Sequence, residues 1–202
     1  MKISVIGAGN IGRTLGKKWV EAEHKVIWGV RNPFSEKVQR LRSELPEGEI
    51  KTITESIQPS EIVLLATPYA AVKDIVQINA SDLAEKIIID SSNNFSSSRI
   101  NNLATIQEAV PSASIYRAFN SLGWEIFENP KFQDFTADHF FAGPNGEERL
   151  LVEQLITDIG LHPIWVGGPE NAYIVDALGS LWVTLVFQRG YKRSTALKLI
   201  KR

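Results

Sequence analysis

Ile3-Ser4-Val5-Ile6-Gly7-Ala8-Gly9-Asn10-Ile11-Gly12 is a short apolar run followed directly by three glycines in Gly-x-Gly-x-x-Gly spacing. The apolar run predicts a buried strand, and apolar residues at near-helical spacing through Ala22 predict a helix behind the turn. In such a turn the glycines permit a tight bend, close approach of a pyrophosphate, and close packing of helix on strand. The helix N-terminus adds free N–H groups and a positive dipole end. The stretch predicts a dinucleotide site formed by Gly7, Gly9, Asn10, Ile11 and Gly12; an ordinary strand-to-helix turn is the alternative.

The residues behind a second predicted strand, Val26-Ile27-Trp28, indicate which dinucleotide is bound. Sites for NAD carry an acidic residue about 20 residues beyond the glycines, on the ribose 2′-hydroxyl, whereas NADP sites place an arginine nearby. No acidic residue occurs from Val26 to Ser35, and Arg31 lies in this window. We expect NADP(H), with its 2′-phosphate near Arg31, Asn32, Ser35 and Lys37. A solvated loop arginine is the alternative.

Composition narrows the class of protein. A chain of 202 residues with 44% hydrophobic residues can bury a substantial core, but it is short for two full domains. Its net charge of −1 argues against nonspecific nucleic-acid binding. The chain has no cysteine, and its three histidines lack metal-ligand spacing, so we expect no thiolate chemistry and no metal site. The first apolar segment is too short for a signal peptide. We therefore expect a cytoplasmic protein that binds no membrane.

Strand and helix patterns alternate along the rest of the chain. Strands are predicted at 50–53, 61–66, 86–90, 114–118, 139–142 and 163–166, and helices at 69–78 and 147–159. The strands at 61–66 and 86–90 are apolar on both faces, as buried parallel strands are. This alternation predicts an α/β protein with a Rossmann-type, doubly wound, mainly parallel sheet. We expect residues 1–120 to form the NAD(P)-binding core and residues 121–202 to form a small α/β extension packed on it.

Small and polar residues follow three of these strands directly. In open α/β sheets, ligands bind outside the carboxyl ends of the strands. The segments at 66–68, 90–94 and 118–123 are therefore predicted to meet the ribose and nicotinamide, through Ala66, Thr67, Pro68, Asn93, Ala118 and Asn120. Helix starts, caps and loop hydrogen bonds are the alternative roles. For Asp90, at a strand end, a structural hydrogen bond is the favoured interpretation.

The C-terminal part combines an apolar helix with a basic tail. Residues 172–187 are almost continuously apolar, too short to span a membrane comfortably, and apolar on nearly every side. We therefore expect a homodimer with this helix at or near the contact. The tail is basic without one acid and forms either a solvated surface or a grip on an anionic substrate: Arg189, Lys192, Arg193, Lys198, Lys201 and Arg202.

Taken in chain order, several motifs resemble those of the NADP oxidoreductases dependent on the deazaflavin coenzyme F420, and of the NADPH-binding domain of six-transmembrane metalloreductases. The motifs are residues 1–12, Gly-x-Arg-Asn-Pro ending at Pro33, Ala66-Thr67-Pro68, Asp90-x-Ser92-Asn93, residues 118–123, Ala142-Gly143 and residues 167–172. The resemblance implies NADP as cofactor and hydride exchange with a flat redox ring. It places the phosphate loop at Gly7 to Gly12, the 2′-phosphate at Arg31 and Asn32, and a nicotinamide wall at Thr67, Pro68, Asn93 and Ala118.

The chain departs from the family at two positions that bear on the second substrate. The family's deazaflavin enzymes carry a histidine where Asn120 stands, and their glycine-rich C-terminal segment is replaced by Arg189-Gly190-Tyr191-Lys192-Arg193. The cofactor prediction does not depend on these positions. The deazaflavin prediction does.

Hydride transfer between a nicotinamide and a flavin or deazaflavin needs no protein nucleophile and no obligatory general acid. We therefore expect no catalytic residue, and Trp124 either stacks on the second ring or belongs to the core. The predicted function is an NADP(H)-dependent oxidoreductase that acts on a small-molecule redox acceptor such as a deazaflavin or flavin. The alternatives are an NADP-binding regulatory module without turnover, and a reductase of a small imine or carbonyl substrate.

Overall fold

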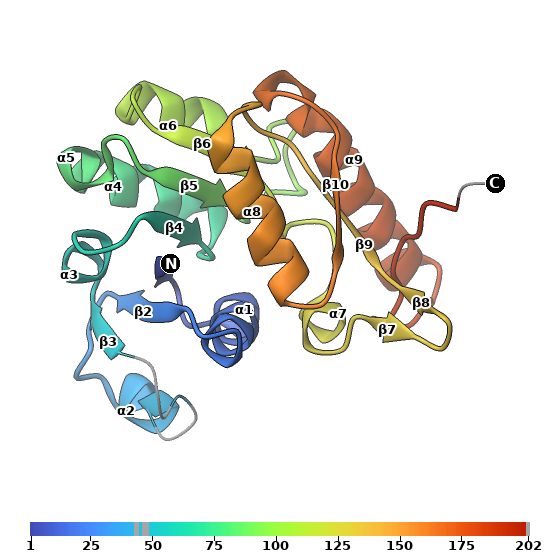
Figure 1. Ribbon diagram of the computed structural model, residues 1–202, viewed down its shortest axis with the longest axis horizontal. Coiled ribbons are helices and arrows are strands. Elements are labelled where there is room, and N and C mark those ends of the chain that lie inside the picture. Colours follow the sequence, from blue (N-terminus) through green and yellow to red (C-terminus); the bar gives the residue numbers. More distant parts are fainter. Residues whose placement is uncertain (43–44, 46–48, 201–202) are drawn as a thin grey trace.

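Six parallel strands form the central sheet of the computed structural model, which describes residues 1–42, 45 and 49–200. The strand order is β3-β2-β1-β4-β5-β6, and Figure 1 shows helices on both faces of the sheet. This order confirms the predicted doubly wound Rossmann-type fold. The strands are β1 Lys2–Ile6, β2 Lys25–Val30, β3 Glu49–Thr52, β4 Ile62–Leu65, β5 Ile87–Asp90 and β6 Ser114–Arg117.

Helices follow most of the strands, as the sequence pattern predicts. Within the described residues they are α1 Asn10–Glu21, α2 Glu36–Arg42, α3 Ile53–Ile57, α4 Tyr69–Ile78, α5 Ala80–Leu83, α6 Leu103–Ala109, α7 Trp124–Glu128, α8 Glu147–Asp158 and α9 Ala172–Val183. A short 3-10 helix at Pro169–Asn171 precedes α9, and a π-helical turn at Thr184–Gln188 continues it.

Alternate side chains of the strands enter two separate buried clusters, one on each face of the sheet. Val5 of β1 packs with α1 and α8 on one face, whereas Ile6 packs with α4 and α6 on the other. The central strand β4 is buried throughout, because both of its faces are covered. The first cluster also includes Trp182 and Val186, so the extension shares a core with the Rossmann part. The division at residue 120 stays a prediction.

The strands predicted at 139–142 and 163–166 exist but do not join the central sheet. β9 Asp138–Phe141 and β10 His162–Trp165 pair with each other in parallel. A single antiparallel bridge, between Arg117 and Ala142, connects β9 to the edge of the central sheet. A short hairpin of β7 Lys131–Phe132 and β8 Phe135–Thr136 precedes them. The extension thus contains its own small sheet.

The strand predicted at 50–53 ends one residue earlier, because Thr52 begins a helix. Thr52 Oγ1 accepts a hydrogen bond from Glu55 N at 3.4 Å, and Glu55 Oε2 accepts one from Thr52 N at 3.1 Å. This reciprocal cap satisfies N–H groups at the start of α3.

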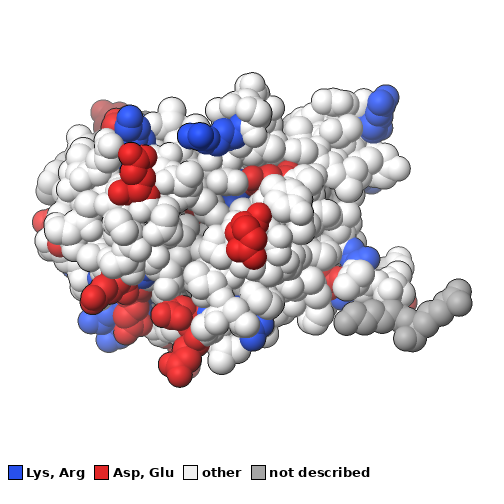
Figure 2. Space-filling view, turned by 90° about the horizontal axis from the view of Figure 1, so that it is seen from above, with Lys and Arg blue, Asp and Glu red and all other residues white. Residues whose placement is uncertain are grey.

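Within the described residues, no helix has both the length and the apolar character needed to cross a bilayer. Figure 2 shows one face of the molecule, on which basic and acidic side chains are interspersed and not gathered by sign.

Candidate functional site

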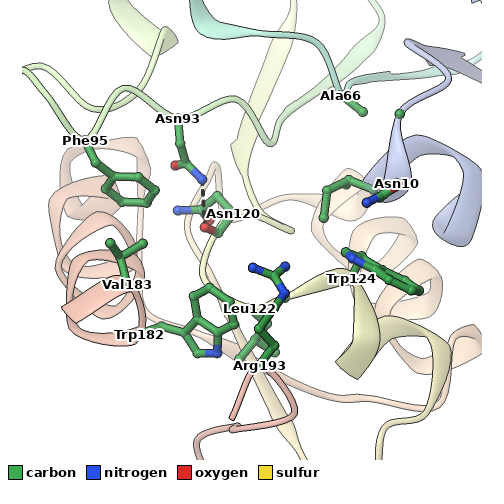
Figure 3. Close-up of a pocket in the computed structure, with 13 residues that line it drawn as sticks. Asn10, Ala66, Asn93, Phe95, Asn120, Leu122, Trp124, Trp182, Val183 and Arg193 are labelled. Atoms are coloured by element: carbon green, nitrogen blue, oxygen red, sulfur yellow. Dashed lines mark hydrogen bonds between the residues drawn. The ribbon is translucent and has the colours of Figure 1, made fainter. Parts of the chain in front are cut away.

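A cavity of about 340 Å³ opens at the carboxyl edge of the sheet, beside β1 and β4. The chain runs outward from β1 to β2 on one side and continues from β4 on the other, so this is the point where the strand order reverses. Figure 3 shows α9 and the C-terminal segment closing the opposite side. The lining residues are Gly9, Asn10, Ile11, Ala66, Asn93, Phe95, Asn120, Leu122, Gly123, Trp124, Trp182, Val183 and Arg193.

The glycines of the turn bring the backbone close to this cavity, beside the side chains of Asn10 and Ile11. Gly7 has φ +105°, and a Cβ there would lie 2.5 Å from the Ala66 carbonyl oxygen. A Cβ on Gly12 would collide with the Gly7 carbonyl oxygen, whereas a Cβ on Gly9 would meet no atom within 4 Å. No side chain caps α1, and its first turn holds no acidic residue. An open cradle before an uncapped helix start fits a pyrophosphate.

The residues predicted to hold the 2′-phosphate lie outside the cavity, behind the end of β2. Arg31 and Asn32 are exposed and Ser35 is half-buried. Lys37 belongs to α2, and its side chain lies outside the described part of the structure. Gly7 N donates to the Gly29 carbonyl at 3.0 Å, which ties the glycine turn to this strand end. Asn32 Oδ1 accepts a hydrogen bond from Phe34 N at 2.9 Å. The amide nitrogen of Asn32 is therefore the group that could donate to a ligand.

The segments behind β4, β5 and β6 differ in how they meet the cavity. Ala66, Asn93 and Asn120 line it. Thr67 lies beside Gly7, and its Oγ1 is buried with no hydrogen-bond partner in the described part of the chain. Pro68 is exposed at the start of α4 and is not a lining residue.

Ala118 does not line the cavity. Its side chain is completely buried in the core that also holds Phe119 and Leu122, so it forms no part of the cavity wall. The peptide behind β6 turns inward at this point, with Phe119 at φ +58°. Asn120 and Leu122 reach the cavity instead of Ala118.

The sequence analysis missed Arg117, which is completely buried under the cavity. Arg117 Nη1 donates to the Asp90 and Ser92 carbonyl oxygens at 3.0 and 2.6 Å, and Nη2 donates to Asn93 Oδ1 at 2.6 Å. Because Asn93 Oδ1 is occupied, its amide nitrogen is the donor, and it reaches the Asn120 carbonyl oxygen at 2.9 Å. The one signal in the sequence was a charged residue that closes an otherwise buried strand.

Two buried carboxylates balance this arginine. Arg117 Nε donates to Asp176 Oδ1 at 2.8 Å, which links α9 to β6. Arg117 Nη1 lies 3.3 Å from Asp90 Oδ2. Asp90 also accepts from Ser92 N at 2.9 Å and from Asn102 N at 2.8 Å. These contacts confirm the structural role expected for Asp90.

His139 is a second buried polar residue behind the site. Its Nε2 accepts a hydrogen bond from Phe119 N at 2.7 Å, and its ring stacks on Phe119 with 4.9 Å between centroids. Burial lowers the pKa of His139 to about 3, so the ring is neutral at ordinary pH. His139 therefore holds the inward turn of Phe119. The other two histidines pair with carboxylates, His24 with Asp158 and His162 with Asp138.

The C-terminal segment, residues 189–200, folds back onto the extension. The Lys198 Nζ group lies 2.7 Å from Asp138 Oδ1, and the Thr195 carbonyl accepts from Trp182 Nε1 at 2.7 Å. Arg193 pairs with Glu125 and enters the cavity wall. Arg189 and Lys192 are exposed. Two further basic residues of the predicted tail, Lys201 and Arg202, lie outside the described residues.

Comparison with known proteins agrees with this architecture. Residues 2–94 match the family model described as "NADP oxidoreductase coenzyme F420-dependent". The chain is 23% identical over 183 residues to metalloreductase STEAP3 of Rattus norvegicus, and the match covers 88% of this chain. It covers 36% of STEAP3, so the chain spans about a third of that relative's length.

Solved structures share the fold. A provisionally described F420-dependent NADP-reductase from Arthrobacter sp. FB24 superposes with a TM-score of 0.86 at 23% identity, with 100% of both chains covered. An imine reductase from Aspergillus terreus, solved with NADPH4 and dibenz[c,e]azepine, gives 0.68 at 20% identity over 93% of this chain and 63% of its own. The resemblance inferred from the motifs is confirmed, because residues 2–94 match the model of the NADP oxidoreductase, coenzyme F420-dependent family.

Proposed function

We propose that the protein is an NADP(H)-dependent oxidoreductase that transfers a hydride between the nicotinamide and a flat redox acceptor, a deazaflavin or flavin. The observation that carries this proposal is the continuity of the cavity. It begins at the glycine turn, at Gly9, Asn10 and Ile11, and extends to walls formed by Phe95, Trp124 and Trp182. An apolar cavity with a few polar groups, next to a pyrophosphate cradle, suits two rings in contact.

Each part of the chain has a separate task in this proposal. The turn from Gly7 to Gly12 and the start of α1 hold the pyrophosphate, and Arg31 with Asn32, Ser35 and Lys37 holds the 2′-phosphate. Asn93, fixed by Arg117, presents its amide nitrogen near the nicotinamide end. Leu122, Trp182 and Val183 exclude water from the reacting rings. When bound, NADPH supplies the hydride itself.

The chemistry of the walls favours a redox ring over a carbonyl or imine substrate. Among the described residues that line the cavity, Arg193 is the one charged side chain, and no carboxylic acid or histidine stands there to protonate a product. Hydride exchange between two cofactor-like rings needs no such proton donor. A module that binds NADP without turnover remains the second candidate, because the phosphate cradle alone would support it.

A panel of acceptors tests the proposal. NADPH oxidation is followed with a deazaflavin, FMN, riboflavin, a ferric chelate, a small imine and a small carbonyl compound, and each assay is repeated with NADH. We expect turnover with a deazaflavin or flavin and preference for NADPH. Turnover with the imine or carbonyl alone would replace this proposal by a small-substrate reductase. Tight NADPH binding with no turnover in any assay would favour the binding module.

A further inference from the structure

Arg193 brings a positive charge to the far wall of the cavity, opposite the glycine turn. Figure 3 shows its guanidinium group directed into the cavity between Leu122 and Trp124. The segment that carries Arg193 is held in place, because the Thr195 carbonyl accepts a hydrogen bond from Trp182 Nε1. The Arg193 carbonyl oxygen also packs close to Gly123, because a Cβ added to this glycine would lie 3.2 Å from that oxygen. Arg193 is therefore a fixed part of the wall.

The surroundings of the guanidinium leave donors available. The Nε and Nη2 groups of Arg193 donate hydrogen bonds to the carboxylate of Glu125. The Cζ atom of Arg193 lies 5.4 Å from the ring centre of Trp182 and 5.5 Å from that of Phe187. Nη1 has no partner in the described part of the chain. An arginine has five N–H donors in a planar fork, so an anion entering the cavity can bind at Nη1 or replace Glu125.

We propose that Arg193 is a specificity-determining residue that selects an acceptor with a negative charge. This charge belongs either to a phosphate or carboxylate on the side chain of the acceptor, or to the acceptor ring after its reduction. This inference rests on the proposed function. Hydride transfer breaks the C4–H bond of NADPH and forms a C–H or N–H bond on the acceptor ring. The hydride carries two electrons and one proton, so NADPH becomes NADP⁺ and a neutral ring becomes an anion. The Arg193 side chain is 42% exposed, so solvent screens part of its attraction to either charge, and the expected effect on binding is moderate.

FMN and riboflavin distinguish the two sources of charge, because they share one ring and differ by a phosphate. Isothermal titration measures their dissociation constants with the wild-type protein and with Arg193→Met, Arg193→Lys and Lys192→Met. If Arg193 recognises the phosphate on the side chain of the acceptor, Arg193→Met weakens FMN binding about tenfold and leaves riboflavin binding unchanged. Arg193→Lys then restores part of the lost affinity. Lys192, exposed on the same segment and outside the cavity wall, is the matched control and should change neither constant by as much.

If the ring charge is recognised, Arg193→Met instead lowers the kcat for riboflavin reduction while the riboflavin dissociation constant stays unchanged. The proposal is overturned if Arg193→Met alters neither FMN affinity nor riboflavin kcat. Absence of turnover with every acceptor would count against the proposed function, whereas the titration would still decide the role of Arg193.

Glu125→Gln gives a prediction of opposite sign. This change removes the carboxylate that competes for the guanidinium, so FMN should bind about threefold more tightly or better, with riboflavin unchanged. Thermal unfolding checks that the variant folds. If Glu125→Gln weakens FMN as much as Arg193→Met does, the ion pair only anchors the segment and the proposal is wrong.

Discussion

Arg31 is exposed just behind β2, and no acidic residue occurs between Val26 and Ser35 to pair with its guanidinium group. A charge-assisted contact is worth about 1.5–3 kcal/mol. Arg31→Ala should therefore raise the dissociation constant of NADPH by about ten- to a hundredfold and leave that of NADH nearly unchanged. Lys25, exposed at the opposite end of the same strand, is the matched control. Equal losses for the two dinucleotides would contradict the assignment of Arg31 to the 2′-phosphate.

Two glycines of the same turn should respond differently to alanine. A Cβ on Gly9 meets nothing within 4 Å, whereas one on Gly12 collides with the Gly7 carbonyl. Gly9→Ala should keep the thermal midpoint of the wild type and weaken NADPH, because the methyl group occupies the space of the phosphates. Gly12→Ala should lose about 1–3 kcal/mol of unfolding free energy. Calorimetry of both variants with and without NADPH separates the two effects, and full NADPH affinity in Gly9→Ala would exclude the turn as the phosphate site.

His139 makes the fold sensitive to acid. Its pKa is lowered to about 3 in the folded protein, while the unfolded chain takes up a proton near the ordinary value of about 6.5. The unfolded state thus binds more protons between these values, and stability falls as the pH falls through this window, by up to about 1.4 kcal/mol per pH unit. Urea unfolding at several pH values should show a shallower decline in His139→Gln than in the exposed-histidine control His162→Gln. Identical declines would contradict this role.

At the scale of elements, Arg117 joins β5, β6 and α9 under the cavity. Arg117→Met leaves Asp90 and Asp176 buried together without a cation, and we expect a loss of about 3–5 kcal/mol of unfolding free energy. Asp176→Asn leaves Arg117 with Asp90 and should cost less. Urea denaturation measures both, with exposed Arg99→Met as control. A loss in Arg117→Met no larger than in Arg99→Met would show that the network contributes little.

The elements also show what the sequence can predict. The periodicity of α4 and the apolar runs of β4 and β5 are local, so the helix at 69–78 and the parallel strands could be predicted from the residues themselves. The burial of Ala118 and the contacts of Arg117 could not. The contacts of Arg117 join segments far apart in the sequence, at Asp90 and Asp176. The turn behind Ala118 is fixed at Phe119 by His139 of β9. Likewise, the placement of Arg193 in the cavity results from the folding back of residues 189–200.

At the scale of the whole molecule, α9 leaves an apolar stripe on the surface. Tyr173 and Leu181 are exposed by 66% and 44%, and Phe187 of the π-helical turn by 63%. The homodimer predicted from the sequence would cover this stripe. We expect the wild type to sediment as a dimer at micromolar concentration and Leu181→Glu to sediment as a monomer. Leu150→Glu, on the exposed side of α8, is the matched control. A monomeric wild type would make the prediction wrong.

The placement of the tryptophans has a practical consequence. Of the five in the chain, Trp19 and Trp28 are buried in the core, whereas Trp124 and Trp182 form part of the cavity wall. A dihydronicotinamide or a flavin absorbs light in the region where indoles emit, so a ligand in the cavity should quench the wall indoles by energy transfer. Replacing Trp124 or Trp182 with phenylalanine would then report, by the emission lost, how near each ring lies to the bound molecule. The protein therefore carries its own optical probe of occupancy, and no label is needed.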